Sequence, residues 1–279
     1  MKTILYATDY SENSAPALQF AYRISKVLNA RLLAIHVFDY PTILQTEVQE
    51  PFPHLEEDAF KAHTRRLKDF CRSHLGEGAK VEIEALEHKN VREAIAGKAL
   101  EEGASLLVVG MKGGSALREL LMGNTTKKLI EEAPCPVLSI PGDASFNGLE
   151  TIVYATDFEE EDIAVLRELA PVAAAFQARI RAVHIASDKE YANLQRREWF
   201  QEALKKELPE AKITFEQEVS EHAFEALRVY LGDHNADLVV MLERKRKGFL
   251  EPIFHRDRVK KMESYGRIPL MAFHEKNFQ

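Results

Sequence analysis

The fold is decided by a stretch at the start of the chain, Thr3-Ile-Leu-Tyr-Ala-Thr-Asp-Tyr-Ser-Glu12, which returns as Thr151-Ile-Val-Tyr-Ala-Thr-Asp-Phe-Glu-Glu160. The match continues without a gap over residues 3–36 and 151–184, at a constant offset of 148 (157 − 9 for the two aspartates). Solenoid repeats have periods of about 20–50 residues, so a match of this length indicates the duplication of a whole domain.

The duplication divides the chain into two domains of ordinary size, as a length of 279 residues also suggests. The boundary falls in the turn-rich segment Pro-Gly-Asp-Ala-Ser-Phe-Asn-Gly at 141–148. We therefore expect an N-terminal domain over residues 1–143 and a C-terminal domain over residues 149–279.

Apolar runs alternate with helical patterns in the first copy. The patterns predict strands at 3–7, 31–38, 80–86, 105–109 and 136–140, and helices at 18–28, 56–74, 91–102 and after 123. The second copy repeats this order, for example at 213–219, 223–231 and 237–242. The alternation predicts an α/β fold with a mostly parallel sheet that is covered on both faces. Ligands of such sheets bind outside the carboxyl ends of the strands.

A glycine-rich stretch, Val-Gly-Met-Lys-Gly-Gly-Ser-Ala-Leu-Arg-Glu-Leu-Leu-Met-Gly-Asn-Thr-Thr, follows the fourth predicted strand at 109–126. Gly110, Gly113 and Gly123 allow the backbone to approach a ligand closely. A helix that begins at Asn124 or Thr125 presents free N–H groups that favour phosphate. The alternative is a loop whose glycines only make turns.

Composition narrows the class of protein. The net charge of −7 argues against a general nucleic-acid binder. Cys71 and Cys135 lie in no zinc or redox motif, so we expect each to be a buried apolar group. The sequence has no signal-like segment and no apolar run of the ~18 residues that a membrane span needs, which predicts a cytoplasmic protein with no membrane partner.

The chain resembles the universal stress protein family in its tandem two-domain form. The resemblance rests on Ile-Leu-Tyr-Ala-Thr-Asp-Tyr-Ser-Glu at 4–12, Ala-Ile-His-Val at 34–37, the glycine spacing, and Ala-Pro-Cys-Pro-Val-Leu at 133–138. It implies two tandem Rossmann-like domains of the adenine nucleotide alpha hydrolase-like type, each with a five-stranded parallel sheet flanked by helices. It also implies ATP binding where the glycine motif is kept, and pairing of the two domains through their last strands.

The resemblance assigns a set of nucleotide-binding positions at the strand ends and the glycine loop. With Lys112, a candidate for approaching the phosphates, they are Ala7, Thr8, Asp9, Val37, Val109, Gly110, Lys112, Gly113, Gly123, Asn124 and Thr125. Asp9 is placed to contact the ribose or a Mg²⁺ ion that the phosphates hold. Asn124 departs from the Ser or Thr that the family prefers, although Asn also caps helices and binds phosphate oxygens.

Each of these assignments has a structural alternative. Asp9 could close the turn after the first strand, and Thr8 could satisfy local backbone groups. Lys112 could be a solvated loop residue. His36 and His184, which recur in apolar strands, are better explained as structural histidines than as catalytic ones.

The second copy lacks the phosphate loop. An offset of 131 places Met241 at the position of Gly110 and Arg244 at that of Gly113, so we expect no ATP binding of the same kind there. The Arg-Lys-Arg-Lys run at 244–247 is then a solvated loop, or a site for an anion or a partner. Because the second copy is expected to fold without these glycines, those of the first copy are expected to serve a ligand.

These features predict a regulatory protein that binds ATP with Mg²⁺ in its N-terminal domain only, with residues 40–55 near the site as a lid. The alternatives are a slow ATPase and a stress-response scaffold that binds no nucleotide. No general base is evident near the phosphates, so no catalytic residue is predicted. Whether the tandem chain also forms a homodimer stays open.

Overall fold

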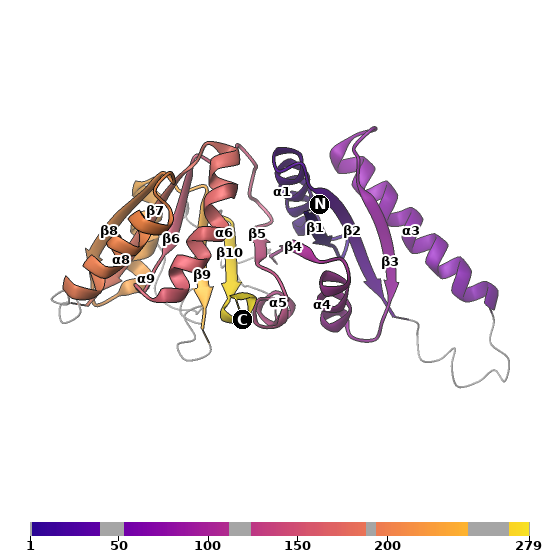
Figure 1. Cartoon of the computed structure of the whole chain (residues 1–279). Helices are drawn as coiled ribbons and strands as arrows, with labels where there is room; N and C mark the ends of the chain where they lie inside the picture. Colours follow the sequence, from indigo (N-terminus) through magenta and orange to yellow (C-terminus); the bar gives the residue numbers. More distant parts are fainter. Residues whose placement is uncertain (1, 40–52, 112–123, 188–193, 245–267, 279) are drawn as a thin grey trace. The chain divides into compact units, whose positions relative to one another are not determined.

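A computed structural model describes residues 2–39, 53–111, 124–187, 194–244 and 268–278. The described residues form two compact units, one up to Met111 with 124–142, and one from Asp143 onward. Each unit is a parallel sheet flanked by helices, which confirms the predicted fold class (Figure 1). The expected lid falls largely on residues 40–52, outside the described residues.

The first unit contains five parallel strands in the order β3-β2-β1-β4-β5. They are β1 (Thr3–Ala7), β2 (Arg31–Phe38), β3 (Glu82–Glu87), β4 (Ala104–Gly110) and β5 (Val137–Ile140). The order runs outward from β1 in both directions, through β2 to β3 and through β4 to β5. The switch point of the sheet, where ligands bind in folds of this kind, therefore lies between β1 and β4.

In the described parts of the connections, four α-helices and one short 3-10 helix lie between these strands. They are η1 (Glu12–Ser14), α1 (Ala15–Val27), α3 (Pro53–Leu75), α4 (Val91–Glu101) and α5 (Asn124–Glu132). Helix α1 contacts α3, and α4 contacts α5. The first pair covers one face of the sheet and the second pair covers the other. This follows from right-handed crossovers that change direction at the switch point. The sequence specifies the helix starts locally, with a proline in the first turn of α1 and the Asn90 side chain capping α4.

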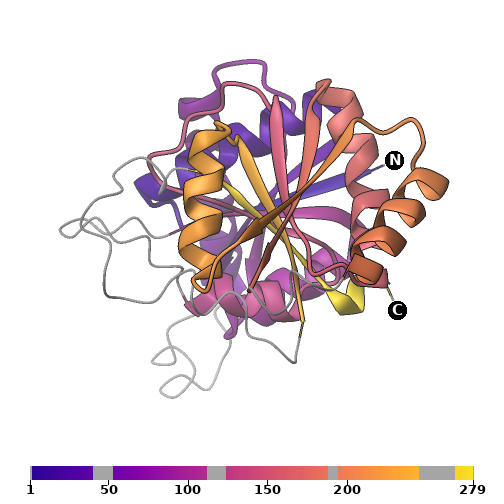
Figure 2. The same cartoon turned by 90° about the vertical axis from the view of Figure 1, so that its left-hand side faces the viewer.

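The second unit repeats the arrangement in the order β10-β9-β6-β7-β8. Figure 2 shows α6 and α8 on one side of its sheet and α9 on the other. Its elements are β6 (Thr151–Ala155), α6 (Glu160–Phe176), β7 (Arg179–Ala186), α8 (Leu194–Glu207), β8 (Ile213–Val219), α9 (Ala223–Asp233), β9 (Leu238–Glu243), β10 (Leu270–His274) and η3 (Glu275–Phe278).

The duplication extends to individual backbone angles and hydrogen bonds. Tyr10 and Phe158, 148 positions apart, both adopt the left-handed conformation, with φ of 63° and 62°. The Nδ1 atom of His36 lies 2.8 Å from the carbonyl oxygen of Thr8, and that of His184 lies 2.7 Å from the equivalent carbonyl. The second copy therefore preserves the turn after the first strand, not only the order of elements.

The strand register corrects one correspondence between the copies. Ala7 pairs with Val109 in the first unit, and Ala155 pairs with Met241 in the second. Because Ala7 and Ala155 are equivalent, Met241 corresponds to Val109. The expectation that Met241 stands at the position of Gly110 is therefore wrong by one residue.

The same register moves the residues that follow. Leu242 corresponds to Gly110, and Arg244 corresponds to Lys112 rather than to Gly113. The side chain that replaces the first glycine is thus a buried leucine, and a cation stands at the same position in both copies.

Gly110 has a packing role that the sequence does not reveal. A Cβ atom at this position would lie 2.8 Å from the carbonyl oxygen of Asn13 and 3.0 Å from the Cα atom of Ser14. The turn η1 therefore packs directly against the end of β4, and only glycine leaves room for it. The expectation that the glycines are dispensable for the sheet is wrong for Gly110, while Gly113 and Gly123 lie outside the described residues.

Both cysteines are buried, as expected. Cys71 and Cys135 are each 5% exposed. Burial raises the pKa of the two thiols to about 11 and about 12, because the thiolate would lose its hydration. In the parts of the chain that the structure describes, no helix is long and apolar enough to cross a membrane.

The packing of η1 predicts opposite effects for two glycine substitutions. Gly110→Ala should lower the free energy of unfolding by about 1–3 kcal/mol, because backbone atoms must move to admit the methyl group. Gly97→Ala is the matched control, since Gly97 lies in α4 with open space around its Cα atom, and it should stabilise by about 0.5–1 kcal/mol. Urea unfolding of both variants measures the difference, and equal stability of the two would contradict this account of Gly110.

Candidate functional site

The carboxyl ends of β1, β2 and β4 meet at one edge of the first sheet. Ala7, the last residue of β1, pairs with Ile35 on one side and Val109 on the other. The residues that follow each strand are therefore neighbours, which brings Asp9 and Gly110 to the same edge. This is the switch point, where α/β folds bind ligands.

The other predicted positions follow the same edge where the structure describes them. Ala7, Thr8 and Val109 are buried, Val37 is half-buried, and Asn124 and Thr125 are exposed. Helix α5 begins at Asn124 and leads into the parallel strand β5, so its N-terminus must face the carboxyl edge of the sheet. Lys112, Gly113 and Gly123 lie outside the described residues.

The side chain of Thr8 is fully engaged within the protein. The hydroxyl of Ser14 donates to the carbonyl of Ser11 at 2.7 Å, so in the 2.8 Å contact between the two hydroxyls it is Thr8 that donates to Ser14. Thr8 Oγ1 also accepts from the backbone N–H of Tyr10 at 3.0 Å. Tyr6 donates its hydroxyl proton to the Ser14 carbonyl at 2.7 Å. These contacts are those of the structural alternative, in which the Thr8 hydroxyl satisfies groups of the turn after β1.

Asp9 combines a structural contact with an exposed charge. Its Oδ1 atom accepts from the backbone N–H of Ser11 at 3.0 Å and closes the turn after β1. The residue is exposed, and no cation among the described residues forms an ion pair with it. Within the described part of the chain, no group of three or more candidate ligands could hold a metal ion.

A stack of rings beside this edge was not expected from the sequence. The ring of His36 lies 4.0 Å from that of Tyr10 and 5.3 Å from that of His63, measured between centroids. His63, on α3, also stacks on Phe38 at 4.2 Å, and the Arg66 guanidinium lies 4.4 Å from the Tyr10 ring centre. The stack joins α3 to β2 and to the turn after β1.

The histidines of this stack favour the neutral state. Burial is the largest cause that lowers the pKa of His36, and the neighbouring His63 and Arg66 lower it further. Burial and Arg66 also lower the pKa of His63. A neutral His36 carries its proton on Nδ1 and donates it to the carbonyl of Thr8, 2.8 Å away. This supports the structural interpretation of His36, which fixes the backbone at the end of β1.

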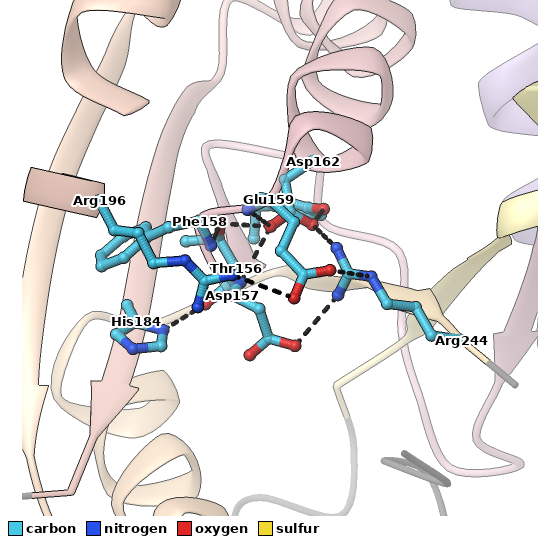
Figure 3. A network of polar contacts seen from close by, with 9 residues as sticks. Thr156, Asp157, Phe158, Glu159, Asp162, His184, Arg196 and Arg244 are labelled. Atoms are coloured by element: carbon cyan, nitrogen blue, oxygen red, sulfur yellow. Dashed lines mark hydrogen bonds and ion pairs between the residues drawn. The ribbon is translucent and has the colours of Figure 1, made fainter. Parts of the chain in front are cut away.

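The equivalent edge of the second unit is occupied by Arg244, directly after β9 (Figure 3). Its Nη1 atom donates to Asp157 Oδ2 at 3.0 Å, and its Nη2 atom donates to Asp162 Oδ1 at 2.7 Å. Its Nε atom lies 3.2 Å from Glu159 Oε2 in an ion pair whose angle is not that of a hydrogen bond. The Arg244 side chain is only 14% exposed.

Asp162 is the centre of this network and is fully buried. Its Oδ1 atom accepts from the Tyr154 hydroxyl at 2.6 Å as well as from the guanidinium. Its Oδ2 atom accepts from the Thr156 hydroxyl at 2.9 Å and from the backbone N–H groups of Asp157 and Glu159 at 3.0 and 3.1 Å. These donors satisfy a charge that would otherwise be costly to bury.

The network corrects both interpretations of the basic run for its first residue, Arg244, alone. Arg244 is neither solvated nor available to an external anion, because three carboxylates surround it; residues 245–247 lie outside the described residues. One feature of the sequence could have predicted this network. At the offset of 148, Ser11 and Ser14 are replaced by Glu159 and Asp162. Two new carboxylates facing one strand end indicate a cation nearby.

Comparison with known proteins gives consistent matches. The model of the universal stress protein family matches residues 1–141 and again residues 148–256. The Thermus aquaticus protein named "Universal stress protein in QAH/OAS sulfhydrylase 3'region" is 33% identical over 141 residues, which cover 50% of this chain and 98% of that protein. Relatives of this kind therefore correspond to one of the two domains.

Two solved structures illustrate the range of matches. A universal stress protein from Archaeoglobus fulgidus DSM 4304 covers 98% of both chains, with a TM-score of 0.69 and 16% identity, so the likeness concerns the fold alone. A universal stress protein solved in complex with cAMP covers 51% of this chain and 98% of its own, with a TM-score of 0.38 and 22% identity.

The neutral histidine stack predicts an acid sensitivity of α3. Because the native state lowers the pKa of both histidines, the unfolded state binds more protons at acidic pH. The histidines therefore cost no free energy of unfolding above their ordinary pKa of 6.5, and this free energy falls as the pH drops from there through the lower native values. Hydrogen exchange of α3 amides, corrected for the intrinsic rate, should therefore lose protection between pH 7.5 and pH 5. His63→Phe keeps a ring in the stack and should reduce this loss, and an unchanged pH profile would refute the assignment.

Proposed function

The chain belongs to the universal stress protein family, and we propose that it is a regulatory protein whose N-terminal domain binds ATP while its C-terminal domain binds none. The observation that carries the proposal is the difference between the two strand-end edges. Asp9 is exposed with no ion pair in the described residues, whereas its counterpart Asp157 is bound to Arg244 at 3.0 Å. Leu242 also stands at the register position of Gly110.

In this proposal, backbone groups supply most of the contacts with the nucleotide. The family resemblance assigns the adenine contact to the backbone of Val37, and Thr8 would contribute only its backbone, because its hydroxyl contacts Ser14 and Tyr10. Asp9 would contact the ribose or a Mg²⁺ ion, which commonly takes one or two carboxylates with phosphate oxygens. The remaining positions are Ala7, Val109, Gly110, Lys112, Gly113, Gly123, Asn124 and Thr125.

The binding would act through linkage rather than through catalysis. A ligand at about 100 times its dissociation constant stabilises the bound state by roughly 2.7 kcal/mol. That is enough to order a segment near the site or to change the population of a partner-binding state. We assign no catalytic residue, so a slow ATPase remains the alternative that turnover measurements would support.

Nucleotide carried by the purified protein tests the proposal directly. Protein isolated without added ligand is denatured, and the released nucleotides are separated and identified. We expect an adenine nucleotide from the wild-type chain and none from Gly113→Val, whose side chain would fill the proposed phosphate site. No nucleotide from the wild type, together with no binding of added ATP or cAMP, would favour a scaffold that binds no nucleotide.

A matched pair of aspartate variants assigns the site to one domain. Asp9→Asn keeps the oxygen that accepts from Ser11 and so preserves the turn, but it removes the charge. It should weaken ATP binding in the presence of Mg²⁺ by about tenfold or more, as expected for the loss of a charge-assisted contact. Asp157→Asn makes the same change in the second domain and should leave ATP affinity unchanged. Titration calorimetry measures both, and equal losses would contradict a single N-terminal site.

Three further features stay predictions or alternatives from the sequence. The pairing of the two domains through their last strands is implied by the family resemblance, the cytoplasmic location is predicted from the absence of a signal-like or membrane-spanning run, and a homodimer of the whole chain is an open alternative.

A further inference from the structure

We propose that the C-terminal domain contains a guanidinium-binding site, formed by Asp157, Glu159 and Asp162, whose permanent ligand is the chain's own Arg244. The site holds the end of β9 against the first turn of α6. The inference concerns the second domain and stands whether or not the first domain binds a nucleotide.

The arrangement of the three carboxylates matches the planar set of N–H donors that a guanidinium group presents. Each nitrogen of Arg244 faces a different carboxylate, at 3.0 Å for Asp157, 2.7 Å for Asp162 and 3.2 Å for Glu159. A guanidinium presents its N–H groups in one plane and at fixed angles, which a lysine ammonium cannot imitate. The three carboxylates arrive together because they lie within six residues of sequence, in the turn after β6 and the first turn of α6.

The carboxylates need this cation. Asp162 is fully buried, and two further carboxylates stand next to it, so their mutual repulsion adds to the cost of removing Asp162 from water. Arg196 approaches only the outer oxygen of Glu159, at 3.6 Å, and is itself more than half exposed. Arg244 is therefore the main source of compensating charge at the buried oxygens among the described residues.

The first domain shows that the fold does not itself require such a site. Ser11 and Ser14 occupy the positions of Glu159 and Asp162, and there the contact between the strand end and the helix start is a backbone contact at Gly110. With Leu242 at that position, the second domain begins α6 directly at Glu160. Glu159, Asp162 and Arg244 together take the place of that contact. The two carboxylates are compensated only when Arg244 is present, and Arg244 is held at this edge only when the carboxylates are present.

Chemical rescue tests the site in the full-length protein. The chain has one tryptophan, Trp199 on α8, so its fluorescence follows unfolding of the second domain. Arg244→Ala should lower the midpoint of this transition by about 6 °C or more, because it leaves a buried carboxylate without its partner. Guanidinium chloride at about 10 mM, far below denaturing concentrations, should then raise the midpoint of the variant but not of the wild type. Sodium and methylammonium chloride at the same ionic strength should have no such effect.

A double-mutant cycle covers the case in which Arg244→Ala fails to fold. Asp162→Ser restores the residue of the first domain and removes the buried charge. Arg244→Ala should therefore cost much less in the Asp162→Ser background than in the wild type, and the double variant should fold. Arg244→Lys should recover only part of the loss.

Additive effects in the cycle, or rescue that is equal for guanidinium and methylammonium, would overturn the proposal. These readouts follow the stability of the second domain, so they are separate from any loss of nucleotide binding in the first.

Discussion

The candidate site depends on the parallel pairing of β1 with a neighbouring strand on each of its two sides. This strand is entirely buried and pairs in parallel with β2 on one side and β4 on the other, because the chain order reverses there. Parallel pairing on both sides forces three strand ends to the same edge. It also places the backbone of Thr8 within reach of His36 from the neighbouring strand, which fixes the turn that carries Asp9. The positions of the site therefore follow from strand order before any ligand is considered.

At the same edge, the two copies differ in the contact that joins the strand after the switch point to the start of a helix. The strand that follows the switch point must be joined to the start of the helix after β1 or β6. In the first domain the backbone of Asn13 packs on Gly110, a contact with no charge that leaves Asp9 exposed. In the second domain the contact is an ion network around Asp162. A side chain now fills the strand end, and the charge at Asp157 is neutralised.

Much of this could be predicted from the sequence, and what could not has identifiable causes. The parallel sheets follow from the alternation of apolar runs and helical patterns, and the strands at 3–7, 31–38 and 213–219 agree with the predicted bounds. Contacts between residues distant in sequence were missed, such as His36 with His63, since no local pattern specifies how a helix packs on a strand. The one-residue error at Met241 arose because strand register depends on pairing with β6, which a count along the chain does not contain.

The two strand-end edges also differ in their charges, and this difference bears on the binding of phosphate groups. A nucleotide triphosphate brings several negative charges, and its Mg²⁺ ion needs a carboxylate that is free to coordinate it. In the first domain Asp9 is exposed and forms no ion pair among the described residues, and the neighbouring strand end carries Gly110 in place of a larger side chain. The second domain places three carboxylates at the same edge, and the largely covered guanidinium of Arg244 is already shared among them. A phosphate that approached Arg244 would compete with these three carboxylates for the same guanidinium. At two positions the copies thus differ, with Ser11 and Ser14 against Glu159 and Asp162, and at the second edge the chain's own Arg244 faces the two added carboxylates.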